Sequence, residues 1–203
     1  MTAPQHPRPQ RMRVSVPAVL ALGSNLGDRE ATIRKAVADL DAADGIRVQQ
    51  LSPLIETPAL KLTGVDYTAP AYLNAVVLVD TVLGPHDLLD AVNAVEEGHG
   101  RVREERWGDR TLDIDIIDYD GRRLDDERLT LPHPRAWERS FVLAPWHAVQ
   151  PDAELAGHGR IDLLLTAAGD AYRPYPDSDT AVSAVHGASA AQDPAEDENG
   201  GAV

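Results

Sequence analysis

Two aspartates, Asp113 and Asp115, stand two residues apart in an apolar run that follows an arginine-rich segment. Successive side chains of a β-strand face opposite sides, so both carboxylates are expected on one face of this strand. Leu112, Ile114 and Ile116 would then share the other face. Paired carboxylates suit a hard divalent cation such as Mg²⁺, whose shell phosphate oxygens can complete. Such a pair is also common on solvated strands, and the neighbouring arginines are what favour a metal here.

The segment before this strand holds four arginines and a tryptophan: Arg101, Arg103, Arg106, Arg110 and Trp107. Guanidinium groups bind phosphate oxygens well. The alternative is a solvated loop whose arginines pair with Glu104, Glu105 and Asp109. An exposed tryptophan between arginine and glycine argues against that alternative, because it needs a surface to cover. We therefore expect a loop that closes over a metal-bound nucleotide and excludes water.

Three aromatic or polar residues suggest a site for a flat ligand. Tyr72 and Asn74 lie two apart on an apolar stretch and would share a strand face. The amide of Asn74 either hydrogen-bonds the sheet or reads the edge of a heterocycle that Tyr72 stacks against. Phe141 is the only phenylalanine in the chain. It is either a core residue or the second half of an aromatic sandwich around a planar ligand.

A second group suggests contacts to the nucleotide. His133 stands between two prolines, with Arg128 before it and Arg139 after it. It is either a capping or surface histidine or a donor to phosphate. Glu96 falls near the end of a predicted helix, where a carboxylate opposes the helix dipole, so it is expected to act outside that helix, on a hydroxyl or an adenine. No Gly-rich phosphate loop with Lys and Ser or Thr is present.

These residues must be positioned by alternating strands and helices. Period-2 and period-3.6 patterns predict strands at residues 14–22, 46–56, 72–82 and 111–119, with a bulge near residues 49–50. Helices are predicted after Asp28 and from Gly84-Pro85, with two short ones near residues 139–149 and 161–168. This order favours an α+β ferredoxin-like sandwich, the split βαβ arrangement, with a mainly antiparallel sheet and helices on one face. Long loops at residues 57–71 and 98–110 are expected to serve the active site.

The composition of the 203-residue chain predicts its domain boundaries and its cellular location. We expect a disordered arm at residues 1–12, one catalytic domain at 13–173 and a disordered acidic tail at 174–203. A net charge of −14 argues against a broad nucleic-acid-binding surface. Without an apolar signal segment, a run long enough to span a membrane or a cysteine, the chain is expected to be cytoplasmic.

An ordered series of motifs runs from about residue 14 to about residue 151. They are Leu22-Gly-Ser-Asn-Leu26, Glu56-Thr-Pro58, Tyr72-Leu-Asn74, Gly100-Arg-Val-Arg103, Arg106-Trp-Gly108, Arg110-Thr-Leu-Asp-Ile-Asp115 and Arg128-Leu-Thr-Leu-Pro-His133. Together they resemble the 6-hydroxymethyl-7,8-dihydropterin pyrophosphokinase family of folate synthesis. The resemblance implies a ferredoxin-like fold and transfer of the pyrophosphoryl group of ATP to the pterin hydroxymethyl group, with release of AMP.

The resemblance also implies a role for each candidate. Asp113 and Asp115 would hold two Mg²⁺ ions and, with Arg101 and Arg110, take part in catalysis. ATP, the co-substrate, would be bound by Glu96, Arg103, Trp107, Arg110, Arg128, Thr130, His133 and Arg139. The pterin would be bound by Thr57, Leu60, Tyr72, Asn74, Asp113 and Phe141, with the two aromatic rings on either side of it.

Other functions remain open at this point. A binding module could keep ATP or pterin without turnover, although intact aspartates and arginines argue against it. A single-strand nucleic-acid binder would stack bases on sheet aromatics, which the acidic charge and single phenylalanine disfavour. A metal-dependent nuclease could use the same carboxylates to cut nucleic acid, but the arginine-rich loop does not require that function. We expect a monomer whose partners are ATP and the pterin, with other folate-pathway enzymes as further candidates, and neither nucleic acid nor membrane.

Overall fold

The computed structural model describes residues 14–61, 64–66, 70–100, 111–169 and 171–176, which are organised around one antiparallel sheet. Its strands follow the order β12–β3–β6–β1–β7, and β2 also pairs with β6. Their bounds are Val16–Ser24 (β1), Ile46–Leu51 (β2), Ile55–Thr57 (β3), Tyr72–Thr81 (β6), Asp113–Tyr119 (β7) and Arg173–Pro174 (β12). Small hairpins are formed by β4 (Ala59–Lys61) with β5 (Gly64–Asp66), β8 (Leu124–Asp125) with β9 (Thr130–Leu131), and β10 (Glu154–Leu155) with β11 (Gly159–Arg160).

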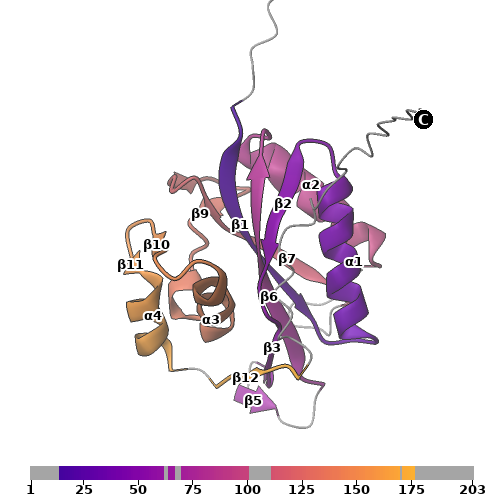
Figure 1. The fold of residues 1–203 in the computed structure, drawn as a ribbon, viewed down its shortest axis with the longest axis vertical. Coiled ribbons are helices and arrows are strands. Elements are labelled where there is room, and N and C mark those ends of the chain that lie inside the picture. Colours follow the sequence, from indigo (N-terminus) through magenta and orange to yellow (C-terminus); the bar gives the residue numbers. More distant parts are fainter. Residues whose placement is uncertain (1–13, 62–63, 67–69, 101–110, 170, 177–203) are drawn as a thin grey trace, which may run out of the picture.

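Two helices, α1 (Arg29–Ala42) and α2 (Pro85–Gly98), cover one face of the sheet (Figure 1). The carboxylate of Asp28 accepts the Ala31 amide at 3.0 Å and caps α1, as the sequence predicted. The buried stripe of α1 is Ile33, Ala36, Val37 and Leu40. The order β1–α1–β2/β3–β6–α2–β7 in an antiparallel sheet confirms the predicted α+β ferredoxin-like sandwich.

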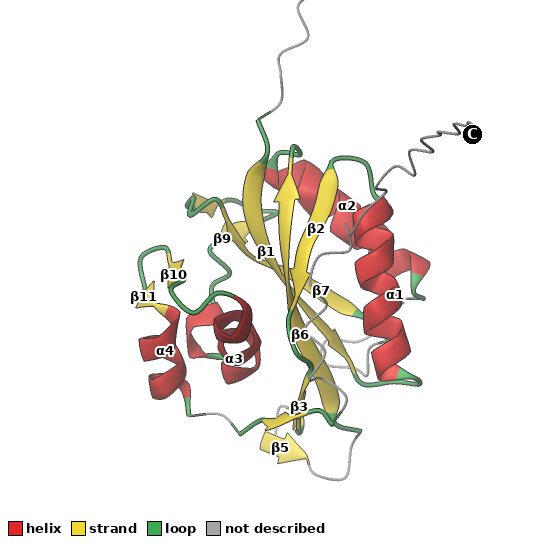
Figure 2. Cartoon of the chain, in the orientation of Figure 1, coloured by secondary structure: helices red, strands yellow, loops and turns green. Residues whose placement is uncertain are grey.

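The other face carries the C-terminal helices α3 (Ser140–Val149) and α4 (Ile161–Ala168), with the short 3₁₀ turn η1 (Ala136–Glu138), as Figure 2 shows. Leu143 and Trp146 of α3 are buried with Val76 and Ile117 of the sheet. Both short helices were predicted, but the expectation that helices cover one face only was wrong. Helices of this apolar composition must bury their surface, and the second sheet face is the partner that the fold offers them.

The predicted strand at residues 46–56 is divided into β2 and β3. The register of β2 shifts between Val48 and Gln50, which confirms the expected bulge. Beyond β2, the Ser52 amide still donates to the Val76 carbonyl at 2.9 Å, but the Val76 amide is accepted by the Ser52 hydroxyl, also at 2.9 Å, in place of a backbone carbonyl. Pro53 then has no amide to donate, so pairing resumes only at Ile55.

Two further expectations about connections need correction. Residues 57–71 were predicted as a plain loop, yet they contain the hairpin of β4 and β5. The predicted domain boundary at residue 173 falls inside β12, and the Tyr175 amide still donates to the Leu54 carbonyl at 3.0 Å. Residues 1–13 and 177–203, which hold the predicted arm and most of the predicted tail, lie outside the described residues. None of the helices that the structure describes has the length and apolarity to span a membrane.

Candidate active site

The predicted carboxylates lie on the sheet face that also carries α3 and α4. Asp113 and Asp115 of β7 are partly exposed, whereas Ile114 and Ile116 are buried in the core beneath α1 and α2. The alternation expected from the sequence is therefore confirmed. Because β7 is the last strand of the sheet, the aspartates stand at one edge of this face.

A cross-strand row connects these carboxylates to the predicted pterin residues. Gly23 of β1 lies opposite Asp113 on one side and opposite Asn74 of β6 on the other. Directly paired residues share a face, so the carboxylate and the amide look out on the same side, two strand spacings or about 10 Å apart. Between them Gly23 has no side chain, and an added Cβ would come within 3.4 Å of the Asn74 amide oxygen.

Sequence reasoning gave Gly23 no role in the site. The signal was a glycine inside an otherwise apolar strand, which often marks the close approach of a ligand. In the structure Gly23 is partly exposed and forms the floor between Asp113, the metal candidate, and Asn74, the pterin candidate.

Two basic groups face Asp115 from the segment after β9. The Nε2 atom of His133 lies 3.7 Å and the Nη1 atom of Arg139 3.8 Å from its Oδ2 atom. Both side chains are about one-fifth exposed, and that of Asp115 is 40% exposed. His133 is held beside β7 because its amide donates to the Ile117 carbonyl at 2.9 Å.

The proton of His133 can be assigned from its contacts. Its Nδ1 atom accepts the Arg135 amide at 3.1 Å, so in the neutral ring the proton is on Nε2, the atom that faces Asp115. Burial lowers the pKa of His133, although the Asp115 carboxylate opposes that effect. Burial also lowers the pKa of Arg139, but a guanidinium stays charged at physiological pH. The pair thus offers one neutral donor and one cation.

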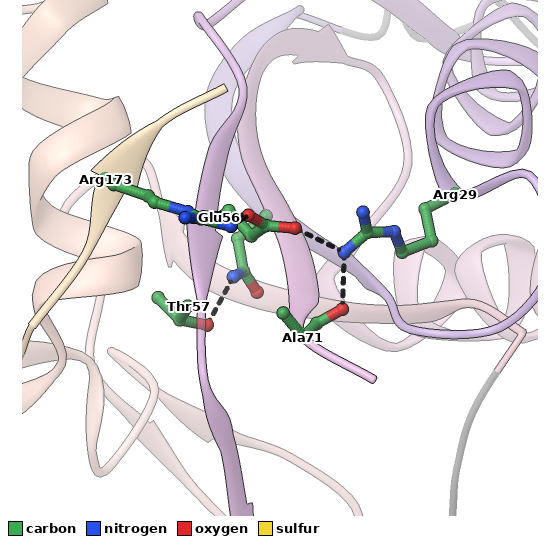
Figure 3. Close-up of polar contacts among 6 residues, drawn as sticks. Arg29, Glu56, Thr57, Ala71 and Arg173 are labelled. Carbon is green, nitrogen blue, oxygen red and sulfur yellow. Dashed lines mark hydrogen bonds and ion pairs between the residues drawn. The ribbon is translucent and has the colours of Figure 1, made fainter. Parts of the chain in front are cut away.

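The opposite end of the face holds Asn74, Thr57 and Tyr72. Asn74 is 6% exposed, and its Nδ2 atom donates to the Thr57 hydroxyl at 2.9 Å (Figure 3). Thr57 pairs directly with Tyr72 across β3 and β6. Leu60 lies in β4, opposite Val65 of β5. The structure therefore brings Thr57, Tyr72 and Asn74 together.

Phe141 stands in the first turn of α3, which packs against β6. The guanidinium carbon of Arg139 lies 5.4 Å from the centre of its ring, within the range of a cation–π contact. Phe141 is only partly buried, and it packs against the apolar cluster between α3, α4 and the sheet. The same short segment thus links the basic group beside Asp115 to the predicted pterin aromatic.

Three predicted nucleotide residues have other partners in the structure. Arg128 pairs with Asp90 of α2, and the Thr130 hydroxyl donates to Asp125 at 3.1 Å. Glu96 is 1% exposed, and its Oε1 atom accepts the Ile114 amide at 2.7 Å. Its unusual helix position is explained by this bond, which ties α2 to the edge strand β7. Arg101, Arg103, Trp107 and Arg110 lie outside the described residues.

The donor set can be tested against Mg²⁺. No group of three or more His, Cys, Asp or Glu side chains is arranged as a metal site within the residues that the structure describes. Mg²⁺ does not need one, because it is usually held by one or two carboxylates together with waters and substrate phosphates. Asp113 and Asp115, partly exposed on one strand face, are such a pair. The residues present therefore fit the ion.

Known proteins resemble this chain in sequence and in fold. Residues 19–151 match the family model described as 7,8-dihydro-6-hydroxymethylpterin-pyrophosphokinase. The 2-amino-4-hydroxy-6-hydroxymethyldihydropteridine pyrophosphokinase of Methylorubrum extorquens is 46% identical over 140 residues, covering 69% of this chain and 86% of the relative. The protein with that name in Bacillus subtilis is 43% identical over 129 residues, covering 63% of this chain and 74% of the relative.

Other matches are longer proteins. A folate synthesis bifunctional protein of Arabidopsis thaliana is 44% identical over 127 residues, which are 63% of this chain and 22% of the relative. A crystal structure of Plasmodium falciparum HPPK-DHPS has a TM-score of 0.58 at 15% identity and supports the fold alone. The match covers 78% of this chain but only 44% of that one. The family expected from the motifs is confirmed, and the chain belongs to the 7,8-dihydro-6-hydroxymethylpterin-pyrophosphokinases, transferases of folate biosynthesis.

Proposed function

We propose that this chain transfers pyrophosphate from ATP to 6-hydroxymethyl-7,8-dihydropterin on the sheet face that bears Asp113, Gly23 and Asn74. The observation that supports this placement is the cross-strand row itself, in which Gly23 separates the carboxylate of Asp113 from the amide of Asn74. In the reaction the hydroxymethyl oxygen bonds to the β-phosphorus of ATP. The bond from that phosphorus to the α–β bridging oxygen breaks, AMP leaves and the hydroxyl proton is lost to the surroundings.

Asp113 and Asp115 are proposed to hold two Mg²⁺ ions. Bound Mg²⁺ would neutralise phosphate charge and orient the triphosphate. The support from this chain is the donor set: two partly exposed carboxylates on one strand face, next to Arg139 and His133.

The pterin is proposed to lie at the Asn74 end of the floor. Asn74 is fixed by its bond to Thr57, so its amide oxygen is presented in one orientation to a donor on the ring edge. Tyr72 and Phe141 would stack on the ring, and Leu60 would contribute from β4. Flat ligands are held well by two aromatic faces because the contact area is large and the rings lose little conformational freedom.

Phosphate binding is proposed for the basic side chains. His133 donates from Nε2, and Arg139 offers a charged fork, both beside Asp115. Arg128 could join them by exchanging its exposed Asp90 partner for a phosphate. Thr130 and Glu96 are the remaining proposed nucleotide residues among those described. Arg101, Arg103, Trp107 and Arg110 are proposed to close over the nucleotide, with Arg101 and Arg110 acting on phosphates.

We further propose that the chain works as a cytoplasmic monomer with ATP and the pterin as its partners. Other folate-pathway enzymes are candidate partners, because relatives named folate synthesis bifunctional protein are much longer than this chain. Gel filtration of the purified chain tests the oligomeric state. A dimer peak at micromolar concentration would contradict it.

Product analysis tests the proposed reaction. Purified protein is incubated with ATP and Mg²⁺, with and without 6-hydroxymethyl-7,8-dihydropterin, and AMP is separated from ADP. We expect AMP only when the pterin is present, its loss on adding EDTA and its return with excess Mg²⁺. Formation of ADP would contradict pyrophosphoryl transfer, and AMP formation unaffected by EDTA would contradict the metal assignment.

A further inference from the structure

A buried carboxylate, that of Glu56, lies between the guanidinium groups of Arg29 and Arg173 (Figure 3). Its strand partner Leu73 is buried beneath α1 and α2, so Glu56 lies on the face opposite the proposed substrate site. Glu56 is 9% exposed and comes from β3. Its Oε1 atom accepts from Arg29 at 2.8 Å, and its Oε2 atom accepts from Arg173, whose Nε atom lies 2.7 Å away. Both carboxylate oxygens are thus occupied by guanidinium groups that come from distant parts of the chain.

One of these arginines also holds the end of the following connection. The Nη1 atom of Arg29 donates to the Ala71 carbonyl at 2.6 Å as well as to Glu56. Glu56 directly precedes Thr57, and Ala71 directly precedes Tyr72. A single guanidinium therefore ties together the two points where the chain leaves β3 and enters β6.

The alternation of β3 separates this cluster from the substrate side. Glu56 pairs with Leu73, which is buried in the core beneath α1 and α2. Thr57 pairs with Tyr72 and so points to the other face, where its hydroxyl accepts the Asn74 amide. Adjacent residues of one strand thus have an anchoring role on one face and a contact to a predicted pterin residue on the other.

Burial raises the pKa of Glu56, but hydrogen bonds from Arg29 and Arg173 outweigh it and hold the pKa below its ordinary value. The carboxylate is therefore ionised at neutral pH. Arg29 occupies the first residue of α1, where a cation is unfavourable against the helix dipole. A cation kept there despite the dipole is consistent with a partner outside the helix, and Glu56 is that partner.

We propose that Glu56, held by Arg29 and Arg173, is a positioning residue for the pterin site. It acts through Thr57 and Tyr72 and touches no substrate itself. This role rests on the proposed function of the opposite face. Arg173 lies beyond residues 19–151, the part that matches the family model, so the segment after the family region contributes to the substrate site.

Kinetics of full-length variants test this role. Glu56→Gln keeps the shape of the side chain but removes the charge that binds both arginines. We expect the KM for the pterin to rise about tenfold, because small displacements of positioning groups have large effects. The KM for ATP should stay within about twofold, since the nucleotide residues lie on other elements. Arg173→Ala, whose side chain is 77% exposed, should raise the KM for the pterin only about threefold.

A double variant tests whether Glu56 and Arg29 act through each other. Arg29→Gln alone should raise the KM for the pterin about tenfold, and Arg29→Gln with Glu56→Gln should be no worse than either single change. The matched control is Arg160→Ala, which removes an exposed arginine that pairs with Asp162 on the other side of the fold. That variant should keep all constants of the unchanged protein.

The outcomes separate this inference from the proposed function. If the unchanged chain forms no pterin-dependent AMP, the proposed function fails and the positioning role fails with it. If the unchanged chain turns over while Glu56→Gln and Arg173→Ala leave the KM for the pterin within twofold, only the positioning role is overturned. A lower thermal midpoint with both KM values unchanged, or with both raised equally, would show a structural role alone and would also overturn it.

Discussion

On the α1 and α2 side of the sheet, residues such as Leu20, Leu22 and Leu73 are buried against helices. On the α3 and α4 side, Val76 and Ile117 are buried in the same way, but Asp113 and Asp115 beside them stay partly exposed. Among the described residues, the same strands thus build one face that is covered by helices, the closed face, and one face that is covered over only part of its area, the open face.

This difference shows how a small α+β domain can place its stabilising core on one face of the sheet and its candidate active site on the other. The closed face supplies the large apolar core, so polar residues on the other face can remain open without loss of the fold. One exception on the closed side is Glu56, whose charge is balanced by two arginines. We therefore expect substitutions on the open face to change activity and those on the closed face to change stability.

The largest expected effect is the loss of activity in Asp115→Ala. Removing a proposed metal carboxylate should reduce kcat/KM by about 10³-fold or more, equivalent to about 4 kcal/mol of transition-state stabilisation. The thermal midpoint should hardly change because the side chain is 40% exposed. Steady-state AMP formation measures the effect, with Asp152→Ala, a 95% exposed carboxylate, as the control. Activity above one-tenth of the unchanged protein would place the metal elsewhere.

Leu88→Ala tests the closed face. This fully buried residue of α2 should lower the free energy of unfolding by about 3 kcal/mol, because the substitution leaves a cavity in the core. Chemical denaturation measures the loss. Activity per folded molecule should be unchanged at a temperature where the variant is folded. A marked change in kcat for the folded protein would mean that the two faces are not separable.

Phe141→Ala sharpens the description of the open face. Loss of one proposed stacking partner should raise the KM for the pterin about tenfold, while the KM for ATP changes by less than about threefold. A small effect on ATP is expected because the substitution also removes the contact between the ring and Arg139. Equal effects on both substrates would contradict the assignment of this ring to the pterin.

The smallest effect is the pH dependence from Glu56. Its pKa is lower in the folded chain than in the unfolded one, where it is about 4.3. Its ion pairs therefore stabilise the fold above the unfolded-state pKa, and that contribution is lost as pH falls through the folded pKa. Urea unfolding of the unchanged protein and of Glu56→Gln measures the effect. The difference between their free energies of unfolding should be smaller at pH 3 than at pH 7. A difference in the free energy of unfolding that does not depend on pH would contradict a stabilising role for these ion pairs.

Much of the fold could be predicted because its main elements carry strong local periodicity. The alternation around Asp113 and Asp115 and the cap at Asp28 depend on residues close in sequence, and both predictions are confirmed. The aspartates and the motifs around them also indicated the family. Local patterns of this kind are reliable because one face of each element must be apolar.

Short elements were missed for the opposite reason. β4 and β5 have three residues each and β12 has two, too few for a period to be recognised. Residues 174–203 were predicted as a tail from their composition, although an edge strand such as β12 tolerates Pro174, whose nitrogen has no hydrogen to donate. Such strands form only because a partner strand is already in place.

The sequence by itself determined the family and the alternating order of strands and helices, and it supplied the residues on which the proposed chemistry of the site rests. Tertiary structure alone decided that α3 and α4 cover the second face, that Gly23 lies between Asp113 and Asn74, and that Glu96 bonds Ile114. It also joined Glu56 to Arg29 and to Arg173. Residue types and spacing indicate the secondary structure and the chemistry available to each segment. Packing between segments distant in sequence depends on the whole core, so no local pattern of hydrophobic residues predicts it.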